Sequence, residues 1–250
     1  MKLKPKLDIL PEGQRLLWPY LRDMPKAFVL YGGTAVALRY GHRQSVDFDF
    51  FTSKQGIDLQ KTGEALPFIG KFLREIRKSS ENHVDFYLDV NGNIVKLTLL
   101  NNQDIVAGSV NPPDICEDNT IKMATPVDLM ACKVLALHNR SEARDYVDVA
   151  EMIKQGIPLQ KGFEAAQAIS RLSRRGTSQL MLDSLQGDFC SKAVAQIVSS
   201  VPDTAIAAKA EESAAILRQA AQSLDIRKAY ATSMKAQACI ERSAMQERDR

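Results

Sequence analysis

The sequence is poor in cysteine and in aromatic residues, and both shortages narrow the class of protein. Its 250 residues include four cysteines, one tryptophan and 6% aromatic residues. The cysteines are widely scattered, with no C-x-x-C pair and no histidine placed to complete a zinc site. This pattern excludes a disulfide scaffold or zinc finger, so we expect buried free thiols and a reducing, cytoplasmic location.

The sequence also lacks a long apolar run and a strong excess of charge. No run approaches the roughly 18 to 20 apolar residues that cross a bilayer, and the basic N-terminus, interrupted by Pro5 and Asp8, lacks the apolar part of a secretory signal. We therefore expect no membrane insertion. A net charge of +3 does not by itself predict nucleic-acid binding. We interpret one short basic cluster as a solvated helix face: Arg74, Arg77 and Lys78.

The character of the sequence changes near residue 155. The first part mixes short β-like runs with helical stretches, which predicts an α+β fold, whereas the part after Ile157 predicts helices only. Gly156 and Pro158 suit the end of one helix and the start of another. The expected domains are therefore residues 1–155 and a helical C-terminal region, residues 156–250.

Local patterns predict the elements of the first domain. Apolar periodicity, turn residues and β-branched runs distinguish helices from strands. We expect a helix at 11–23, a strand at 28–31, a helix at 34–40, a strand at 46–51, helical pieces at 59–68, strands at 84–90 and 93–100, and helices at 126–138 and 143–154.

The strands at 84–90 and 93–100 flank Asn91-Gly92, the dipeptide favoured by two-residue type I′ turns. A turn of this type fixes the register of the hairpin, so the facing pairs can be counted outward from it. On one face the predicted pairs are Asp89 with Ile94, Tyr87 with Lys96, and Asp85 with Thr98. The other face is apolar and predicts a core side.

A glycine pair follows the predicted strand at 28–31. Gly32, Gly33 and Thr34 lie where this strand passes into a helix, so free backbone N–H groups and the positive end of the helix can face an anion. Glycine permits close approach of a phosphate, and the Thr34 hydroxyl can cap the helix or bond a phosphate oxygen. An ordinary turn is the alternative interpretation.

Asp47 and Asp49 are two residues apart on the next predicted strand. Side chains at this spacing share a face, roughly 6 to 7 Å apart, and divalent cations relieve the repulsion between such carboxylates. Because two-metal enzymes use this arrangement, we predict two Mg²⁺ ions with a nucleoside triphosphate as substrate. An exposed strand face is the alternative, but the opposite side is expected to be buried through Val46, Phe48, Phe50 and Phe51.

The stretch YGGTAVALRYGHRQSVDFDFF, Tyr31 to Phe51, resembles the signature of the AbiEii/AbiGii toxin family, a branch of the DNA polymerase β-like nucleotidyltransferases. The resemblance implies the polymerase β-like fold with a mixed sheet. Its family-specific part is G-H-R-x-S, which includes Arg43 and Ser45. These two residues are expected at the nucleotide, where an arginine stabilises phosphate charge; a surface arginine is the alternative for Arg43.

A second stretch, Thr125 to Ile153, is similar to the family's helix pair with a lysine followed by R-D-x-x-D. Lys133 lies in an otherwise apolar helical stripe, so it either reaches out to solvent or, as the resemblance implies, contacts the triphosphate. Asp145 and Asp148 share a face of the next helix. The roles predicted for Asp145 are holding Lys133 in place or deprotonating the acceptor, and a structural helix-start acid is the alternative.

One position departs from the pattern that the resemblance implies. Members of the superfamily usually carry a third carboxylate on a later strand, where this chain has Thr98. Since Asp85 is predicted to face Thr98 across the hairpin, we predict that Asp85 supplies the missing metal ligand.

The resemblance implies transfer of a nucleotide to an acceptor hydroxyl with release of pyrophosphate. The expected acceptor is RNA or tRNA, and the enzyme is expected to be the toxin of a type IV-like toxin–antitoxin or abortive-infection system, restrained by a cognate antitoxin protein. Two alternatives stay open: a nucleotidyltransferase with a small-molecule acceptor, and a catalytically degenerate nucleotide-binding or interaction module. The tail from Thr204 to Arg250 contains amphipathic stretches that are expected to dock on the first domain.

Overall fold

The structure is a computed structural model, and it describes residues 2–102, 105–106, 109, 111–118, 120–140, 142–172, 204–225, 227–229 and 231. The chain forms two compact units. The first comprises Met1–Val106 and Asn111–Thr125, and the second comprises Ala107–Val110 and Pro126–Arg250. Residue 155 falls inside the second unit, and the division into residues 1–155 and 156–250 stays a prediction.

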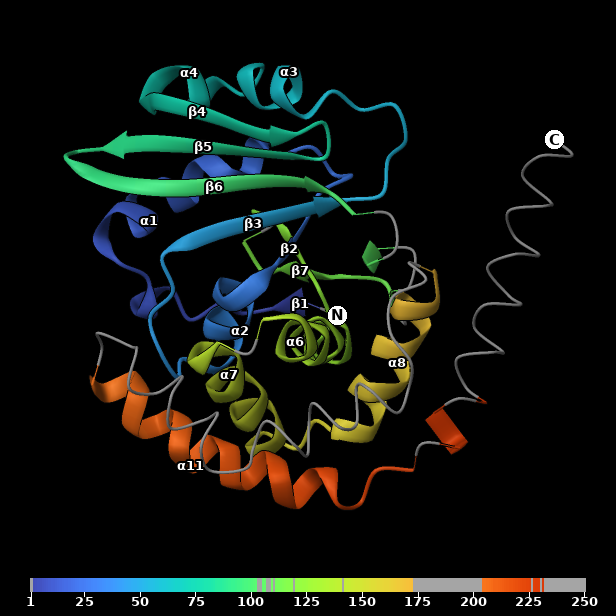
Figure 1. Ribbon diagram of the computed structural model, residues 1–250. Helices are drawn as coiled ribbons and strands as arrows, with labels where there is room; N and C mark the ends of the chain where they lie inside the picture. Colours follow the sequence, from blue (N-terminus) through green and yellow to red (C-terminus); the bar gives the residue numbers. More distant parts are fainter. Residues whose placement is uncertain are drawn as a thin grey trace, which may run out of the picture. The chain divides into compact units, whose positions relative to one another are not determined.

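The first unit is built on a sheet of eight described strands (Figure 1). Their order across the sheet is β1, β7, β8, β2, β3, β6, β5, β4. The strands are β1 (Lys2–Leu3), β2 (Val29–Tyr31), β3 (Asp47–Thr52), β4 (Leu73–Ser80), β5 (His83–Val90), β6 (Asn93–Asn101), β7 (Asp114–Cys116) and β8 (Lys122–Met123). Strand β3 is antiparallel to β2 but parallel to β6. The sheet is therefore mixed, which confirms the predicted α+β fold class.

The helical elements of this unit are short. They are the 3-10 helices η1 (Leu7–Ile9) and η2 (Trp18–Asp23) and the α-helices α1 (Glu12–Leu17), α2 (Gly32–Tyr40), α3 (Leu59–Glu64) and α4 (Pro67–Phe72). The single helix expected at 11–23 is thus divided into α1 and η2, whose first turn contains Pro19. Proline is well tolerated in a first turn because it has no N–H to donate.

One face of the sheet carries the apolar core. Phe48 and Phe50 of β3 lie on this face and are fully buried. Helices α1 and α3 pack closely against it, since a Cβ at Gly13 would touch Val95 and one at Gly63 would overlap the ring of Phe86. Burying each large side chain contributes about 1.5–3 kcal/mol. This packing leaves the alternate residues of β3, β6 and β5, including both predicted acids, on the other face.

The hairpin of β5 and β6 has the predicted turn and register. Asn91 and Gly92 have φ angles of 54° and 83°, as a type I′ turn requires. The predicted pairs Asp89–Ile94, Tyr87–Lys96 and Asp85–Thr98 all face one another, which confirms the register.

Strand β4 was missed, and the helical interpretation of its basic cluster is wrong. Arg74, Arg77 and Lys78 lie on this edge strand, which is exposed along most of its length. Arg77 faces Asp85 in the register, and its Cζ lies over the ring of Tyr87, 4.7 Å from the ring centroid. Lys78 instead faces Val84, on the side of the sheet that carries the core. The alternating apolar pattern that signals a strand is absent from β4 because its side chains are exposed, except for the partly buried Ile76.

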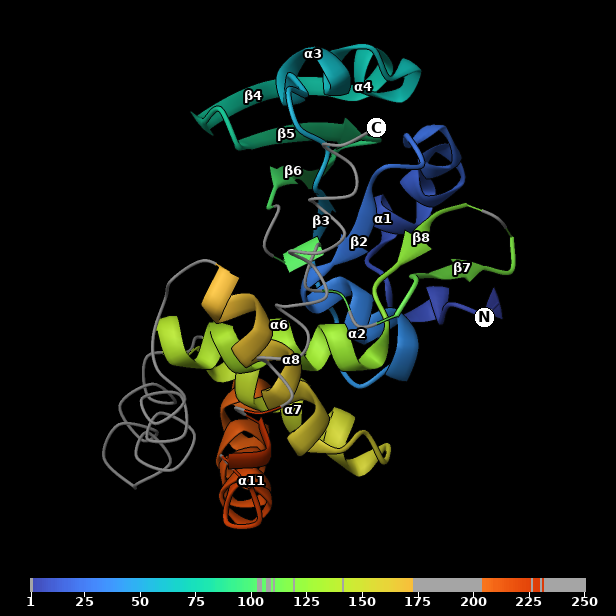
Figure 2. The same ribbon diagram turned by 90° about the vertical axis from the view of Figure 1, so that its right-hand side faces the viewer.

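The described part of the second unit is helical, and Figure 2 shows its helices as a group: α6 (Pro126–Asn139), α7 (Ala143–Lys154), α8 (Leu159–Leu172) and α11 (Thr204–Ala221). Helix α11 belongs to the predicted amphipathic tail. It packs on α7 through a cluster that joins Ala210 to Ala143 and Val147, and Lys154 bonds Glu212 at 2.8 Å. The predicted docking of the tail is thus seen for this helix, although its contacts are with the helical unit, and the rest of the tail lies largely outside the described residues.

Two of the cysteines are in the described part of the chain. Cys116 is buried, Cys132 is partly buried, and both are free thiols. Burial raises the pKa of the Cys116 thiol to about 12, so this sulfur stays protonated and unreactive. Cys190 and Cys239 lie outside the described residues. Within the described residues, the helices are too short or too polar to traverse a lipid bilayer.

Candidate active site

The first part of the site is the turn between β2 and α2. Gly32 has a φ of +74° and begins α2 directly after Tyr31. The helix therefore starts two residues earlier than predicted, and Gly32, Gly33 and Thr34 occupy its first three positions. Backbone N–H groups at these positions have no partner within a helix and point outward with the positive end of the helix dipole. The turn can therefore receive a phosphate through its main chain.

Asp47 and Asp49 lie beside this turn, on the face of the sheet opposite the core. Asp49 pairs with Tyr31 of β2 on one side and with Thr98 of β6 on the other. A Cβ at Gly32 would overlap Oδ2 of Asp49, so one acid lies directly against the start of α2. Both carboxylates are partly exposed, which leaves them accessible to a ligand.

The prediction for the opposite side of β3 is half right. Phe48 and Phe50 are fully buried, but Val46 is 55% exposed and lies before the strand begins. Phe51 lies on the same face as the acids and stacks on Tyr31, with ring centroids 4.9 Å apart. Strict alternation along the strand places residue 51 with residues 47 and 49.

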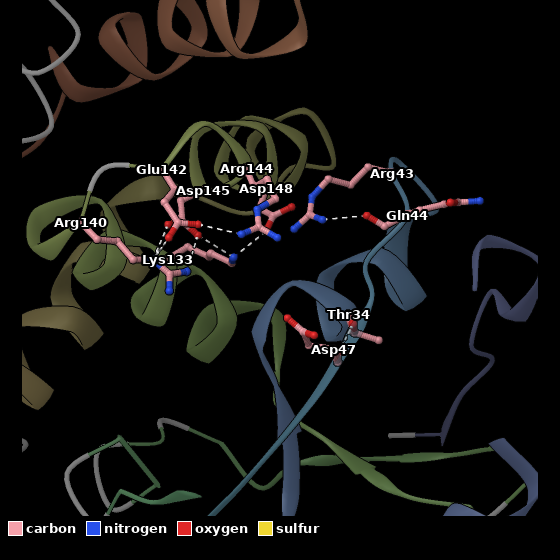
Figure 3. A network of polar contacts seen from close by, with 10 residues as sticks. All are labelled: Thr34, Arg43, Gln44, Asp47, Lys133, Arg140, Glu142, Arg144, Asp145 and Asp148. Carbon is pink, nitrogen blue, oxygen red and sulfur yellow. Dashed lines mark hydrogen bonds and ion pairs between the residues drawn. The ribbon is translucent and has the colours of Figure 1, made fainter. Parts of the chain in front are cut away.

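Arg43 and Ser45 gather at the same helix start. A Cβ at Gly33 would overlap the Arg43 guanidinium and would lie 3.1 Å from Oγ of Ser45. The Arg43 side chain is buried, and its Nη1 donates to the carbonyl of Gln44 at 2.8 Å (Figure 3). The surface-arginine alternative is therefore wrong. A guanidinium beside free N–H groups is suited to phosphate oxygens.

Thr34 lies at the site, but its hydroxyl does not have the predicted role of a helix cap. The hydroxyl donates to the backbone carbonyl of Asp47 and does not cap α2. This bond ties the first turn of the helix to the strand that carries the acids. Its contribution to an anion site is then its backbone N–H.

Asp85 lies on β5, two strands away from Asp49, with Thr98 between them in the register. It is largely buried, and its Oδ1 interacts with three groups: Thr98 Oγ1 at 2.8 Å, His83 Nε2 at 3.1 Å and Lys96 Nζ at 3.4 Å. Burial alone would raise the pKa of Asp85, but the bonds from Thr98 and His83 and the charge of Lys96 hold it below its ordinary value. Asp85 therefore remains ionised.

Lys96 lies on the face of the predicted acids but was not among the residues predicted for the site. It lies beside Asp47 in the register of β3 and β6, and it is partly exposed on the face of the acids. Burial acts to lower its pKa, but the charges of Asp85, Asp47 and Asp49 outweigh burial and raise it. The hairpin count placed Lys96 opposite Tyr87, but only the long-range pairing with β3 places it beside an acid.

The second unit contains the other predicted residues. Lys133 is only 6% exposed, and its Nζ lies 2.8 Å from Oδ1 of Asp145 and 2.6 Å from Oδ2 of Asp148. Figure 3 shows the three side chains pointing toward one another from α6 and α7. The alternative in which Lys133 reaches out to solvent is therefore wrong. Its ammonium is already held by two carboxylates, so within this unit the three residues form an ion-pair cluster.

Arg140 completes this cluster. Its Nε and Nη2 lie 3.0 and 3.2 Å from the two carboxylate oxygens of Asp145. Burial would raise the pKa of Asp145, but Lys133 and Arg140 together hold it below its ordinary value. A carboxylate with a lowered pKa is a weak base, which favours the holding role of Asp145 over deprotonation.

The pair Asp47 and Asp49 fits one hard divalent cation. Mg²⁺ is usually bound by one or two carboxylates, keeps several waters and takes further ligands from substrate phosphates. Among the residues that the structure describes, no three His, Cys, Asp or Glu side chains form a group that could hold a metal ion. Asp85 is thus not gathered with the pair, and its role as a metal ligand stays a prediction.

Comparisons with known proteins identify the family of the chain and structures with a similar fold. The profile of the family described as "Nucleotidyl transferase AbiEii toxin, Type IV TA system" matches residues 20–238. The fold resembles that of MenT4, a nucleotidyltransferase toxin from Mycobacterium tuberculosis, with a TM-score of 0.61, 16% identity and coverage of 90% of this chain and 89% of that chain. A protein of H. pylori assigned to the nucleotidyltransferases gives a TM-score of 0.48 and 18% identity over 85% of this chain and 96% of that chain. No curated protein matches the sequence.

Proposed function

The chain belongs to the AbiEii family of nucleotidyl transferase toxins, and from this premise we propose that it moves a nucleotide from a nucleoside triphosphate to an acceptor hydroxyl at Asp47 and Asp49. The acceptor oxygen would form a bond to the α-phosphorus while the bond to the bridging oxygen breaks and pyrophosphate leaves. The hydroxyl proton would pass to a carboxylate of the pair or to water. The observation that carries the proposal is the contact of Asp49 with the glycine turn, because it places a carboxylate beside an anion site.

Each residue of the first unit has a task in this reaction. Asp47 and Asp49 would hold Mg²⁺, which when bound supplies positive charge against the triphosphate and the leaving pyrophosphate. The N–H groups of Gly32, Gly33 and Thr34 would bind phosphate oxygens. Arg43 would add a guanidinium, and Ser45 a hydroxyl, on the Gly33 side of the turn.

The roles of the second unit rest on the resemblance and on its internal contacts. We propose that Asp145 and Asp148 hold the Lys133 ammonium in one position. Contact of that ammonium with the triphosphate, as predicted from the sequence, would then neutralise phosphate charge. The prediction of a second Mg²⁺ depends on Asp85 as an additional ligand.

RNA or tRNA is the proposed acceptor, and the proposed biological role is that of a toxin that a cognate antitoxin restrains. The family description, a type IV toxin–antitoxin system, supports this role. Expression should arrest growth, and co-expression of the product of a neighbouring open reading frame should relieve the arrest. Growth arrest that persists in Asp49→Asn would separate toxicity from nucleotide transfer.

The direct test is incubation of purified protein with each α-labelled nucleoside triphosphate, Mg²⁺ and total RNA. We expect label in RNA with the intact protein, and a loss of at least about 100-fold with Asp47→Asn or Asp49→Asn, because charge stabilisation by the metal is removed. Asp23→Asn is the matched control, since Asp23 is an exposed acid at the end of η2.

The same experiment separates the alternatives. Label in pooled metabolites but not in RNA would identify a small-molecule acceptor. Nucleotide binding without transfer to RNA, protein or metabolites would identify the degenerate binding module, for which Thr98 at the position of the usual third carboxylate is the supporting observation.

A further inference from the structure

Lys96, on β6, faces the same side of the sheet as Asp47 and Asp49. The alternation of the strands places it beside Asp47 and two residues before Thr98. Its side chain is 31% exposed, so its ammonium can reach a ligand. A lysine at the predicted metal site matters because its charge has the same sign as that of the metal.

Asp85 fixes the position of this ammonium. Lys96 Nζ lies 3.4 Å from Asp85 Oδ1, and the same oxygen accepts the Thr98 hydroxyl at 2.8 Å. His83 contacts it as well, at 3.1 Å. Asp85 is largely buried, and its carboxylate contacts the side chains of Lys96, Thr98 and His83. It therefore holds these side chains in position.

The two positions of β6 beside the acids therefore hold a hydroxyl and an ammonium. Thr98, beside Asp49, gives its hydrogen bond to Asp85, and Lys96 lies beside Asp47. On these three strands the carboxylates of Asp47, Asp49 and Asp85, together with the Lys96 ammonium, leave two net negative charges. The guanidinium of Arg43, beside Gly33 at the start of α2, makes this region less negative still. One divalent cation neutralises the two negative charges, whereas two ions would leave an excess of positive charge in the absence of substrate.

We propose that Lys96, held by Asp85, supplies a fixed positive charge beside the pair Asp47 and Asp49, so that without nucleotide the site takes one divalent ion and not two. Asp85, Thr98 and His83 position the ammonium. This inference rests on the proposed function of Asp47 and Asp49, because it concerns the same site. It reassigns Asp85 from metal ligand to the residue that holds Lys96.

The test is the binding of Mn²⁺ to the full-length protein without nucleotide, measured by the electron paramagnetic resonance signal of the free ion. We count only sites that Asp49→Asn abolishes, which removes weak binding to surface acids. One such site per chain is expected in the unsubstituted protein. In Lys96→Met the affinity should rise about tenfold, because a positive charge on the face that would hold the divalent ion is removed.

Two variants serve as controls. Lys96→Arg keeps the charge and should keep the affinity, which shows that charge and not shape is responsible. Lys78→Met removes an exposed lysine of β4, which β5 separates from β6, on the opposite face of the sheet, and it should leave Mn²⁺ binding unchanged. Circular dichroism of each variant establishes that it is folded.

Three results would overturn the proposal, and each has a different consequence for the proposed function of the acids. Two sites in the unsubstituted protein, with one lost in Asp85→Asn, would restore Asp85 as a metal ligand; this result requires no lysine variant. One site with equal affinity in Lys96→Met would refute the role of Lys96 alone. No site sensitive to Asp49→Asn would also remove the proposed metal function of the pair.

Discussion

The first carbon of any side chain at position 32 would overlap Oδ2 of Asp49, so Gly32 and Asp49 can keep their arrangement only while residue 32 is glycine. The φ angle of +74° at Gly32 imposes the same choice independently. Two separate constraints thus act on one residue. Their effects can be measured apart because Gly56 shares only one of them.

Gly32→Ala is expected to reduce both stability and metal binding, whereas Gly56→Ala should reduce stability alone. Gly56 has a φ of +67°, and a Cβ added there would meet nothing within 4 Å, so its substitution costs only the backbone strain of about 1–2 kcal/mol. Urea unfolding and Mn²⁺ titration of both variants are the measurements. Normal Mn²⁺ binding by Gly32→Ala would show that the contact with Asp49 is not needed to hold the acid.

Thr34→Val should weaken the fold but spare nucleotide binding. The substitution removes the hydroxyl that bonds the carbonyl of Asp47 but keeps the backbone N–H of residue 34. Loss of this partly buried hydrogen bond should cost about 0.5–1.5 kcal/mol. We would compare the urea midpoint with nucleotide affinity from calorimetry. A large loss of affinity at nearly unchanged stability would instead support direct contact of the hydroxyl with phosphate.

Lys133→Met should destabilise the protein by about 3–5 kcal/mol, because two buried carboxylates lose the buried ammonium between them, and the Arg140 that remains on Asp145 is half exposed. The control is Lys154→Met, which removes an ion pair of the same 2.8 Å length to Glu212. Both of those side chains are largely exposed, so the expected cost is only about 0–1 kcal/mol. If Lys133→Met were as stable as the control yet inactive, the main task of Lys133 would be contact with substrate.

Acid should unfold the protein partly through Asp145. Because its pKa is lowered in the folded state, its contribution is complete above the unfolded value of about 3.9 and is lost as the pH falls through the folded value. Stability should therefore decline below about pH 4. Urea titrations at successive pH values would show a shallower decline for Asp145→Asn, and an identical decline would exclude this carboxylate as a contributor.

Features that depend on neighbouring residues were predictable from the sequence. Asn91-Gly92 defines the hairpin turn, and the period of two then determines that Asp85 faces Thr98. The glycine pair likewise marks the start of α2, although the helix begins at Gly32 and not at Thr34. In each case a short-range steric rule decides the structure.

Features that depend on distant pairing were not predictable. Strands β1, β7 and β8 have only two or three residues, and each is defined by its partner. The parallel pairing of β3 with β6 places Lys96 beside Asp47, across 49 positions of sequence. Edge strand β4 shows no apolar alternation, so its basic residues suggested a helix. Pairings between residues far apart in the sequence cannot be predicted from a local pattern of residues.

The positions of the strands along the chain also determine which parts of the sheet are synthesised first. The block of β3, β6, β5 and β4 needs no residue beyond Asn101, so the acids and their neighbours on β6 can assemble while the rest of the chain is still being made. Strand β2, which leads into the glycine turn, has its second neighbour in β8 at Lys122–Met123, and Lys133 is synthesised later still. The ribosome therefore delivers the carboxylate pair before it delivers the helices of the second unit.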